Sequence, residues 1–275
     1  MTTPMITLNN GVAIPQLGFG VFQVPDDETA AAVSGAIAVG YRSIDTAAVY
    51  FNEAGVAQGI ADSGIAREEL FITTKVWNSA QGYDSTLKAF DESAERLGLD
   101  QVDLYLIHWP TPEFDTYLET WRALETLVRD GRIRAAGVSN FQPAHLQRVF
   151  DSSDLVPAVN QIELHPGLQQ NELQKIHAEH GIATEAWSPL GRGAILDDPV
   201  ITAISARLGK TPAQVVLRWH IQLGNIVIPK SVTPSRIAEN IQVFDFALTN
   251  DDMADIAAMD RGQRIGPNPD EFNVR

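Results

Sequence analysis

The chain has 275 residues, a length that suits one large domain or two small ones. Its formal net charge of -15 argues against nucleic acid or an anionic membrane as a partner, although a small anionic ligand senses only the local charge. The lack of cysteine excludes disulfides and thiolate zinc sites. The first residues do not resemble a signal peptide, and no apolar run approaches the roughly 20 residues of a membrane helix. We therefore expect a soluble protein of the cytoplasm.

Strand and helix patterns alternate along the chain. Asn10 and Gly11 lie between two apolar stretches and predict a hairpin, because an Asn-Gly turn tolerates positive φ at both positions. Short β-rich runs predict strands at residues 16–20, 42–45, 70–77, 102–109, 133–139, 157–164, 183–190 and 225–230. Apolar periodicity and capping residues predict helices at residues 26–40, 52–64, 84–98, 114–131, 143–150, 170–181, 199–208, 212–223, 233–244 and 249–260.

These units predict an α/β fold with a parallel sheet. Eight strand-helix units in about 250 residues favour a (β/α)8 TIM barrel. We expect one domain over residues 1–275, with an N-terminal β-hairpin and an irregular C-terminal tail. The alternative is an open doubly wound sheet, which normally carries a three-glycine fingerprint after its first strand. The runs GFGVFQ and GRGAIL each lack the third glycine, so the barrel is favoured.

Four ionisable residues fall at or just after the ends of three successive predicted strands. They are Asp45, Tyr50, Lys75 and His108. Each alone is more often structural, as a wedge in the barrel mouth, a hydrogen-bonded histidine or a buried ion pair. The carboxyl ends of barrel strands form the active site, however, and four coincidences at that end are less probable than one function. The four residues therefore predict a catalytic group.

The chemistry of this group suits proton donation to a substrate oxygen. A free tyrosine has a pKa of about 10, and a neighbouring Lys75 ammonium lowers the pKa of Tyr50. Asp45 would hold Lys75 and keep it charged, since an unpaired buried lysine tends to lose its proton. His108 could donate a hydrogen bond that orients a carbonyl group. A nucleophile is missing, and a hydride supplied by a cofactor would fill that gap.

The chain resembles the aldo-keto reductases over its whole length. GYRSIDTA resembles the first signature of that family, IPKSVTPSRIAEN resembles its C-terminal signature, and the four ionisable residues match its catalytic tetrad. The segments GVFQ, HWPTPEFD and RIGPNPDEF look most like bacterial members of the 2,5-diketo-D-gluconic acid reductase type. The resemblance implies a monomeric (β/α)8 barrel and NADPH-dependent reduction of aldehydes and ketones to alcohols.

A cofactor site can also be read from the residues around Thr233, a plausible N-cap that precedes a proline suited to the first helical turn. A helix N-terminus attracts phosphate. Lys230, Ser231 and Arg236 add a point charge, a hydroxyl and a guanidinium fork, which favour the 2′-phosphate of NADPH over NADH. The two cations alone would be read as a solvated helix start, but they stand beside the tetrad in an acidic chain.

The resemblance implies further cofactor contacts. Ser139, Asn140 and Gln161 would bind the nicotinamide carboxamide, and Trp187 would stack on the ring where many members have tyrosine. Ser188, Leu190 and Gly191 would follow the pyrophosphate, and Glu239 and Asn240 would contact the adenine. Without the family, several of these residues would be read as ordinary turn formers.

Aromatic residues are expected to wall the substrate pocket. These are Phe22, Trp77, Trp109 and Trp187. We expect the tail around Asn268 to fold over the opening. His177 and His180 have a spacing that can suit a metal, but surface histidines explain them as well, so no metal site is predicted.

The sequence therefore predicts an NADP-dependent oxidoreductase that reduces small aldehydes, α-dicarbonyls or keto sugars, with Tyr50 as the general acid. Its partners would be small carbonyl compounds, without nucleic acid or membrane. One alternative is a non-catalytic nucleotide-binding barrel, which a broken tetrad would have indicated. A short-chain dehydrogenase would need lysine four residues after a tyrosine, and no tyrosine here has one. Arg42 belongs to the family motif without an evident role.

Overall fold

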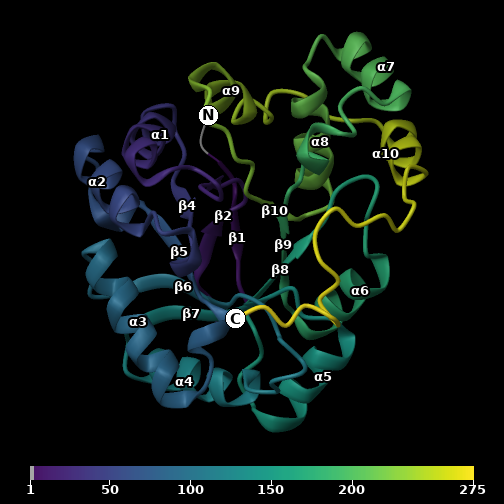
Figure 1. Ribbon diagram of the computed structural model, residues 1–275. Coiled ribbons are helices and arrows are strands. Elements are labelled where there is room, and N and C mark those ends of the chain that lie inside the picture. The colour runs from purple at the N-terminus through teal and green to yellow at the C-terminus, as the bar shows by residue number, and fades with distance from the viewer. Residues whose placement is uncertain (1–2) are drawn as a thin grey trace.

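The computed structural model describes residues 3–275 and shows a barrel of parallel strands ringed by helices (Figure 1). Each strand is hydrogen-bonded in parallel to the next in chain order. The strands are β3 (Phe19–Gly20), β4 (Ser43–Asp45), β5 (Phe71–Val76), β6 (Val102–Ile107), β7 (Ile133–Ser139), β8 (Val159–Glu163), β9 (Ala183–Trp187) and β10 (Ile226–Val227). A parallel bridge between Leu17 and Val227 joins the first strand segment to the last, so the sheet closes.

Helices follow the strands as the sequence predicts. Those that alternate with the strands are α1 (Asp26–Ala38), α2 (Glu53–Ser63), α3 (Tyr83–Leu97), α4 (Tyr117–Arg129), α5 (Pro143–Ser152), α6 (Asn171–His180), α8 (Pro212–Gln222) and α9 (Pro234–Asn240). Two more, α7 (Pro199–Leu208) and α10 (Asn250–Ala257), stand beside α8 at the upper right of Figure 1. This arrangement confirms the predicted barrel. Within residues 3–275, no helix is both long and apolar enough to cross a membrane.

The N-terminal hairpin closes one end of the barrel. Its strands, β1 (Met5–Thr7) and β2 (Ala13–Pro15), pair antiparallel as predicted. Leu8 and Ile14 are buried in one apolar cluster with Phe71 and Ile226, which are the first residues of β5 and β10. The hairpin thus seals the amino ends of the strands and leaves a functional site to their carboxyl ends. Its turn has positive φ only at Gly11 and not at Asn10, because five residues, not two, separate the paired strands.

Two polar side chains, those of Asn52 and Arg42, tie loops and helices together. Asn52 precedes α2, but its side chain does not cap that helix; it donates to the carbonyls of Val21 and Val24 and accepts from Thr46. Arg42 donates to the carbonyl oxygens of Ile37 and Tyr41 at the end of α1. Basic side chains satisfy free carbonyls at helix C-termini in this way, which gives Arg42 a structural role.

Candidate active site

The four predicted catalytic residues converge at the carboxyl ends of the strands. Asp45 is the last residue of β4, Lys75 lies near the end of β5, and His108 directly follows β6. Tyr50 ends a short 3-10 turn over Ala48–Tyr50. All of these except Lys75 line one cavity of about 470 Å³, and Lys75 lies fully buried beneath it.

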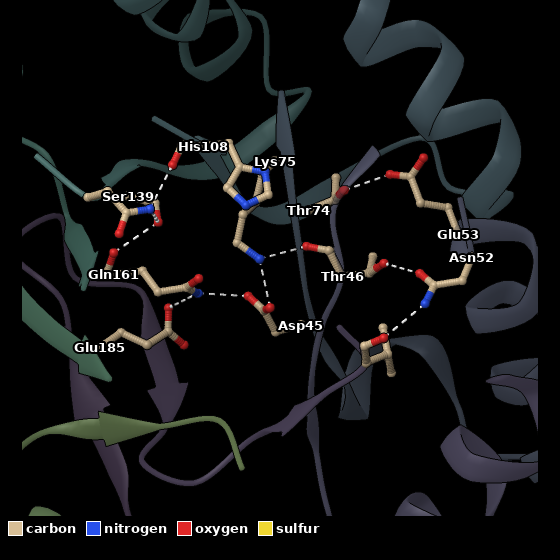
Figure 2. Close-up of polar contacts among 12 residues, drawn as sticks. Asp45, Thr46, Asn52, Glu53, Thr74, Lys75, His108, Ser139, Gln161 and Glu185 are labelled. Atoms are coloured by element: carbon tan, nitrogen blue, oxygen red, sulfur yellow. Dashed lines mark hydrogen bonds and ion pairs between the residues drawn. The ribbon is translucent and has the colours of Figure 1, made fainter. Parts of the chain in front are cut away.

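A buried ion pair forms the floor of this site. The Nζ atom of Lys75 lies 2.7 Å from Oδ1 of Asp45 and donates to the carbonyl oxygen of Thr46 at 2.8 Å (Figure 2). Burial lowers the pKa of Lys75, but the charges of Asp45 and Tyr50 raise it more, so the net shift is upward. Lys75 therefore keeps its proton, as the sequence predicts.

Tyr50 stands over this pair. The Nζ atom of Lys75 is 5.2 Å from the centre of the Tyr50 ring, and the Tyr50 and His108 rings meet edge to face at 5.6 Å. Burial raises the pKa of Tyr50 and the Lys75 ammonium lowers it, with a net upward direction. The predicted lowering by Lys75 is present, but burial outweighs it, so the net shift of the Tyr50 pKa in the protein alone is upward.

His108 is neutral in this setting. Burial, followed by the charge of Lys75, holds its pKa well below the ordinary value of 6.5. Its Nδ1 atom is buried and has no hydrogen-bond partner among residues 3–275. A neutral imidazole can donate one N–H to a ligand oxygen, which agrees with the predicted orienting role.

A network of amides and hydroxyls continues from His108 to Trp187. The side-chain amide of Asn140 donates to the His108 carbonyl and to Ser139, both at 3.0 Å, and its oxygen accepts from the Trp187 indole at 2.8 Å. Ser139 donates to the backbone carbonyl of Gln161 at 2.9 Å. These contacts hold a flat indole and several polar groups at the cavity wall, a set that suits an aromatic ring carrying a carboxamide.

The predicted phosphate and adenine residues line a second cavity of about 750 Å³. Those that border it are Ser188, Leu190, Lys230, Ser231, Arg236, Glu239 and Asn240. Gly191 is buried and borders neither cavity. Thr233 does not cap α9 with its side chain; its backbone N–H donates to Ser231 instead. Phe22, Ser188 and Lys230 border both cavities, so the two form one continuous groove from the tetrad to the cations.

The predicted aromatic wall is present, and the C-terminal tail completes it. Phe22 packs on Tyr50 with ring centres 5.0 Å apart, and Trp77 packs on His108 at 5.2 Å. Trp109 contacts Phe272 of the tail at 4.4 Å. The tail thus covers the opening as expected, although Asn268 itself does not border the cavity and Phe272 does. Phe272 was missed because nothing in a local pattern says where an irregular tail returns.

Three further residues of the site escaped prediction. Glu185, in β9, is buried and accepts a hydrogen bond from Gln161 at 2.8 Å. Arg192 borders both cavities and adds a third cation near Lys230. Glu163, at the end of β8, accepts from the backbone of the tail. Glu185 and Glu163 could have been found by asking why an acid stands in a predicted barrel strand.

The two histidines with metal-like spacing have other partners. His177 is buried, contrary to a surface position, and hydrogen-bonds to Asn160 at 2.9 Å and Thr184 at 2.8 Å. His180 stacks on Phe150 with ring centres 4.1 Å apart. Both imidazoles thus help to hold α6 against neighbouring elements, one through hydrogen bonds and the other through stacking.

Comparison with known proteins identifies the family. The model of the aldo/keto reductase family matches residues 16–261. The chain belongs to the aldo/keto reductase family. It is 54% identical to glyoxal reductase of Bacillus subtilis, covering 97% of this chain and 96% of that protein. It is 49% identical to the methylglyoxal reductase DkgA of Escherichia coli, covering 98% of each.

Solved structures agree with this membership. A variant of Gox0644 in complex with NADPH has a TM-score of 0.95 and 50% identity, and the match covers 99% of each chain. Members of the aldo/keto reductase family are NADP-dependent oxidoreductases, which confirms the predicted enzyme class and cofactor type. The similarity to DkgA also confirms the predicted type of bacterial relative. The roles given to single residues stay predictions.

Proposed function

We propose that this aldo/keto reductase reduces small aldehydes, α-dicarbonyls and keto sugars with NADPH, and that Tyr50 is the general acid. The observation that carries the proposal is the Tyr50 ring beside a buried Lys75–Asp45 ion pair, at the floor of an aromatic cavity. Bacterial relatives named for glyoxal and methylglyoxal support the α-dicarbonyls.

The residues present fit the proposed cofactor. NADPH would supply a hydride at the cavity floor. Trp187 offers a flat face, and Asn140 holds it through the indole N–H. Arg236 borders the second cavity, and Arg192 and Lys230 border both cavities, so positive charge gathers along the part of the groove where the phosphates would bind. The two adjoining cavities and their positive charge thus suit a phosphorylated dinucleotide.

The reacting carbonyl would be held by two groups of the chain. His108, neutral because its pKa is low, donates a hydrogen bond to the carbonyl oxygen and orients it. Tyr50 then gives its proton to that oxygen as negative charge develops there. Lys75, which stays protonated beside Asp45, stabilises the phenolate that remains. Phe22, Trp77, Trp109 and Phe272 keep bulk water away from the reacting atoms.

Turnover by a Tyr50→Phe variant tests the acid. NADPH oxidation is followed with glyoxal, methylglyoxal and a keto sugar, and again with NADH. We expect the variant to lose at least about 10²-fold in kcat, the usual contribution of a positioned proton donor, while it quenches NADPH fluorescence like the wild type. Turnover close to that of the wild type would remove Tyr50 from the role of acid. NADPH binding without turnover in the wild type would favour the non-catalytic barrel.

The state of the protein in the cell is a separate part of the proposal. We infer a single barrel domain over residues 1–275 that works as a monomer in the cytoplasm, as the family resemblance implies. Light scattering of the purified protein gives its mass in solution directly. A mass close to 30.0 kDa is the expected result, and twice that value would show a dimer.

A further inference from the structure

A second buried carboxyl group lies beneath the tetrad. Glu185 is in β9, inside the barrel, and its side chain is 1% exposed. The amide nitrogen of Gln161 donates to Oε2 of Glu185 at 2.8 Å and to Oδ2 of Asp45 at 2.8 Å (Figure 2). One amide group therefore bridges two acids that stand 140 positions apart in the chain, one of which holds Lys75.

The charges in this cluster do not balance. Two acids, Asp45 from β4 and Glu185 from β9, face one ammonium, that of Lys75 from β5, and Tyr50 stands above them. The neighbouring strands add no further charge at this level, because β8 contributes the amide of Gln161 and β10 contributes Ile226 in register with Glu185. Lys75 pairs with Asp45, so Glu185 has no cation of its own among the described residues.

An acid in such a place keeps its proton at neutral pH. Burial, followed by the charge of Asp45, raises the pKa of Glu185 from 4.5 to about 8. A protonated Glu185 can still accept from Gln161. Above about pH 8 it becomes a second negative charge under Tyr50 and Lys75.

We propose that Glu185 is a positioning residue for the proton of Tyr50, because its carboxyl group changes charge beneath the Lys75–Asp45 pair and so sets how firmly Tyr50 holds that proton. The inference rests on the proposed function. Reduction needs protonated Tyr50, whereas alcohol oxidation needs the phenolate. The negative form of Glu185 raises the pKa of Tyr50, so it extends reduction to higher pH and delays oxidation.

Glu185→Gln tests this role, because glutamine can accept from Gln161 but cannot ionise. The kcat/KM values of methylglyoxal reduction and of oxidation of the matching alcohol are measured from about pH 6 to about pH 11, which extends past the ordinary pKa of tyrosine. We expect both profiles to move to lower pH by about half a unit or more, with less than about tenfold change at the plateau. Thr184→Val is the matched control. Thr184 precedes Glu185 in β9, and the change removes its hydrogen bond to His177 of α6. We expect both profiles to stay in place.

Thermal unfolding gives a readout that does not depend on turnover. A pKa raised from 4.5 to about 8 stabilises the fold fully below about pH 4.5 and loses this effect as pH rises to about 8. The wild type should therefore lose stability relative to Glu185→Gln between pH 5 and pH 8. Thr184→Val should show no such trend relative to the wild type.

The outcomes separate the inference from the proposed function. Superimposable pH profiles, or a constant difference in melting temperature, would overturn the role of Glu185 while leaving the reductase activity intact. A uniform loss of activity without a shifted profile would likewise show a structural residue only. If the wild type reduces no carbonyl compound with NADPH, the proposed function fails and the inference falls with it.

Discussion

At the scale of single residues, the site depends on a lysine that is fully buried and still charged. Leaving a buried ammonium unpaired costs several kcal/mol, so Lys75 requires Asp45 at 2.7 Å and the Thr46 carbonyl at 2.8 Å. The same positive charge disfavours a proton on His108 and favours the phenolate of Tyr50. One ammonium thus acts in opposite senses on its two neighbours, favouring the uncharged imidazole and the charged phenolate, as their proposed roles require.

The neutral state of His108 is a prediction at this scale. Because burial and Lys75 hold its pKa well below 6.5, the imidazole should stay neutral at about pH 6, where a free histidine is largely protonated. Nitrogen-15 NMR of histidine-labelled protein distinguishes the two forms, and His108→Asn assigns the signal. Protonation of His108 near pH 6.5 would contradict the expectation.

At the scale of elements, the C-terminal tail is held against the barrel by Glu163. This buried acid accepts from the backbone N–H groups of Ile265 and Gly266, at 2.6 and 3.0 Å, and from His165 at 3.2 Å. Burial raises the pKa of Glu163, but these hydrogen bonds lower it more. A side chain at Gly266 would meet Trp187 at 2.4 Å, so the tail passes directly over that indole. Glu163 therefore fixes the tail where it crosses Trp187, ahead of the point at which Phe272 covers the pocket.

Glu163→Gln should loosen this cover. The new side-chain NH2 group would face a backbone N–H of the tail and could not accept a hydrogen bond from it. The tail would lose one acceptor, and Phe272 would lose its fixed position. We expect KM for the carbonyl substrate to rise by roughly tenfold, about 1.4 kcal/mol, with NADPH affinity unchanged. Asp270→Asn is the control, since the charged partner of this exposed tail residue within residues 3–275 is His145 at 3.6 Å, and the change should leave KM alone. An unchanged KM in Glu163→Gln would show that the tail is held by other contacts.

The contact between α1 and α2 gives a second prediction for elements. An added Cβ at Gly59 would meet the Ala30 carbonyl and Val33 at 2.7 Å, whereas one at Gly35 would meet nothing within 4 Å. Gly59→Ala should therefore lower the free energy of unfolding by about 1–3 kcal/mol through overpacking. Gly35→Ala should raise it by about 0.5–1 kcal/mol, because alanine favours a helix interior. Denaturant unfolding measures both, and equal effects would contradict the packing argument.

At the scale of the whole molecule, a chain with a net charge of -15 carries a cationic site for an anionic cofactor. Lys230 precedes α9, and Arg236 lies in the first turn of that helix. Arg192 comes from the segment after β9. Barrel closure brings these two segments together on one groove. The positive charge is therefore local in a chain of negative net charge, which limits long-range attraction of an anionic cofactor.

Arg236→Met should weaken NADPH binding by about 10–100-fold, the worth of one charge-assisted hydrogen bond, and leave NADH binding unchanged. Fluorescence titration at two salt concentrations measures both. Salt should weaken NADPH binding less in the variant than in the wild type, since one charge contact is gone. The control is Lys88→Met. Lys88 lies on α3, its side chain is 80% exposed and it does not border the groove, so the change should alter neither affinity. Equal loss for both cofactors would argue against a 2′-phosphate contact.

The sequence by itself determined the barrel and the tetrad. Strand and helix periodicity is local, and each of Asp45, Lys75 and His108 stands at the end of its own strand, so parallel closure brings them together without further information. Only the tertiary structure decided the rest. Gln161 links Asp45 to Glu185 and Phe272 reaches Trp109 through contacts that depend on register and on the path of the tail. Such contacts join segments far apart in the chain, and no local pattern encodes them.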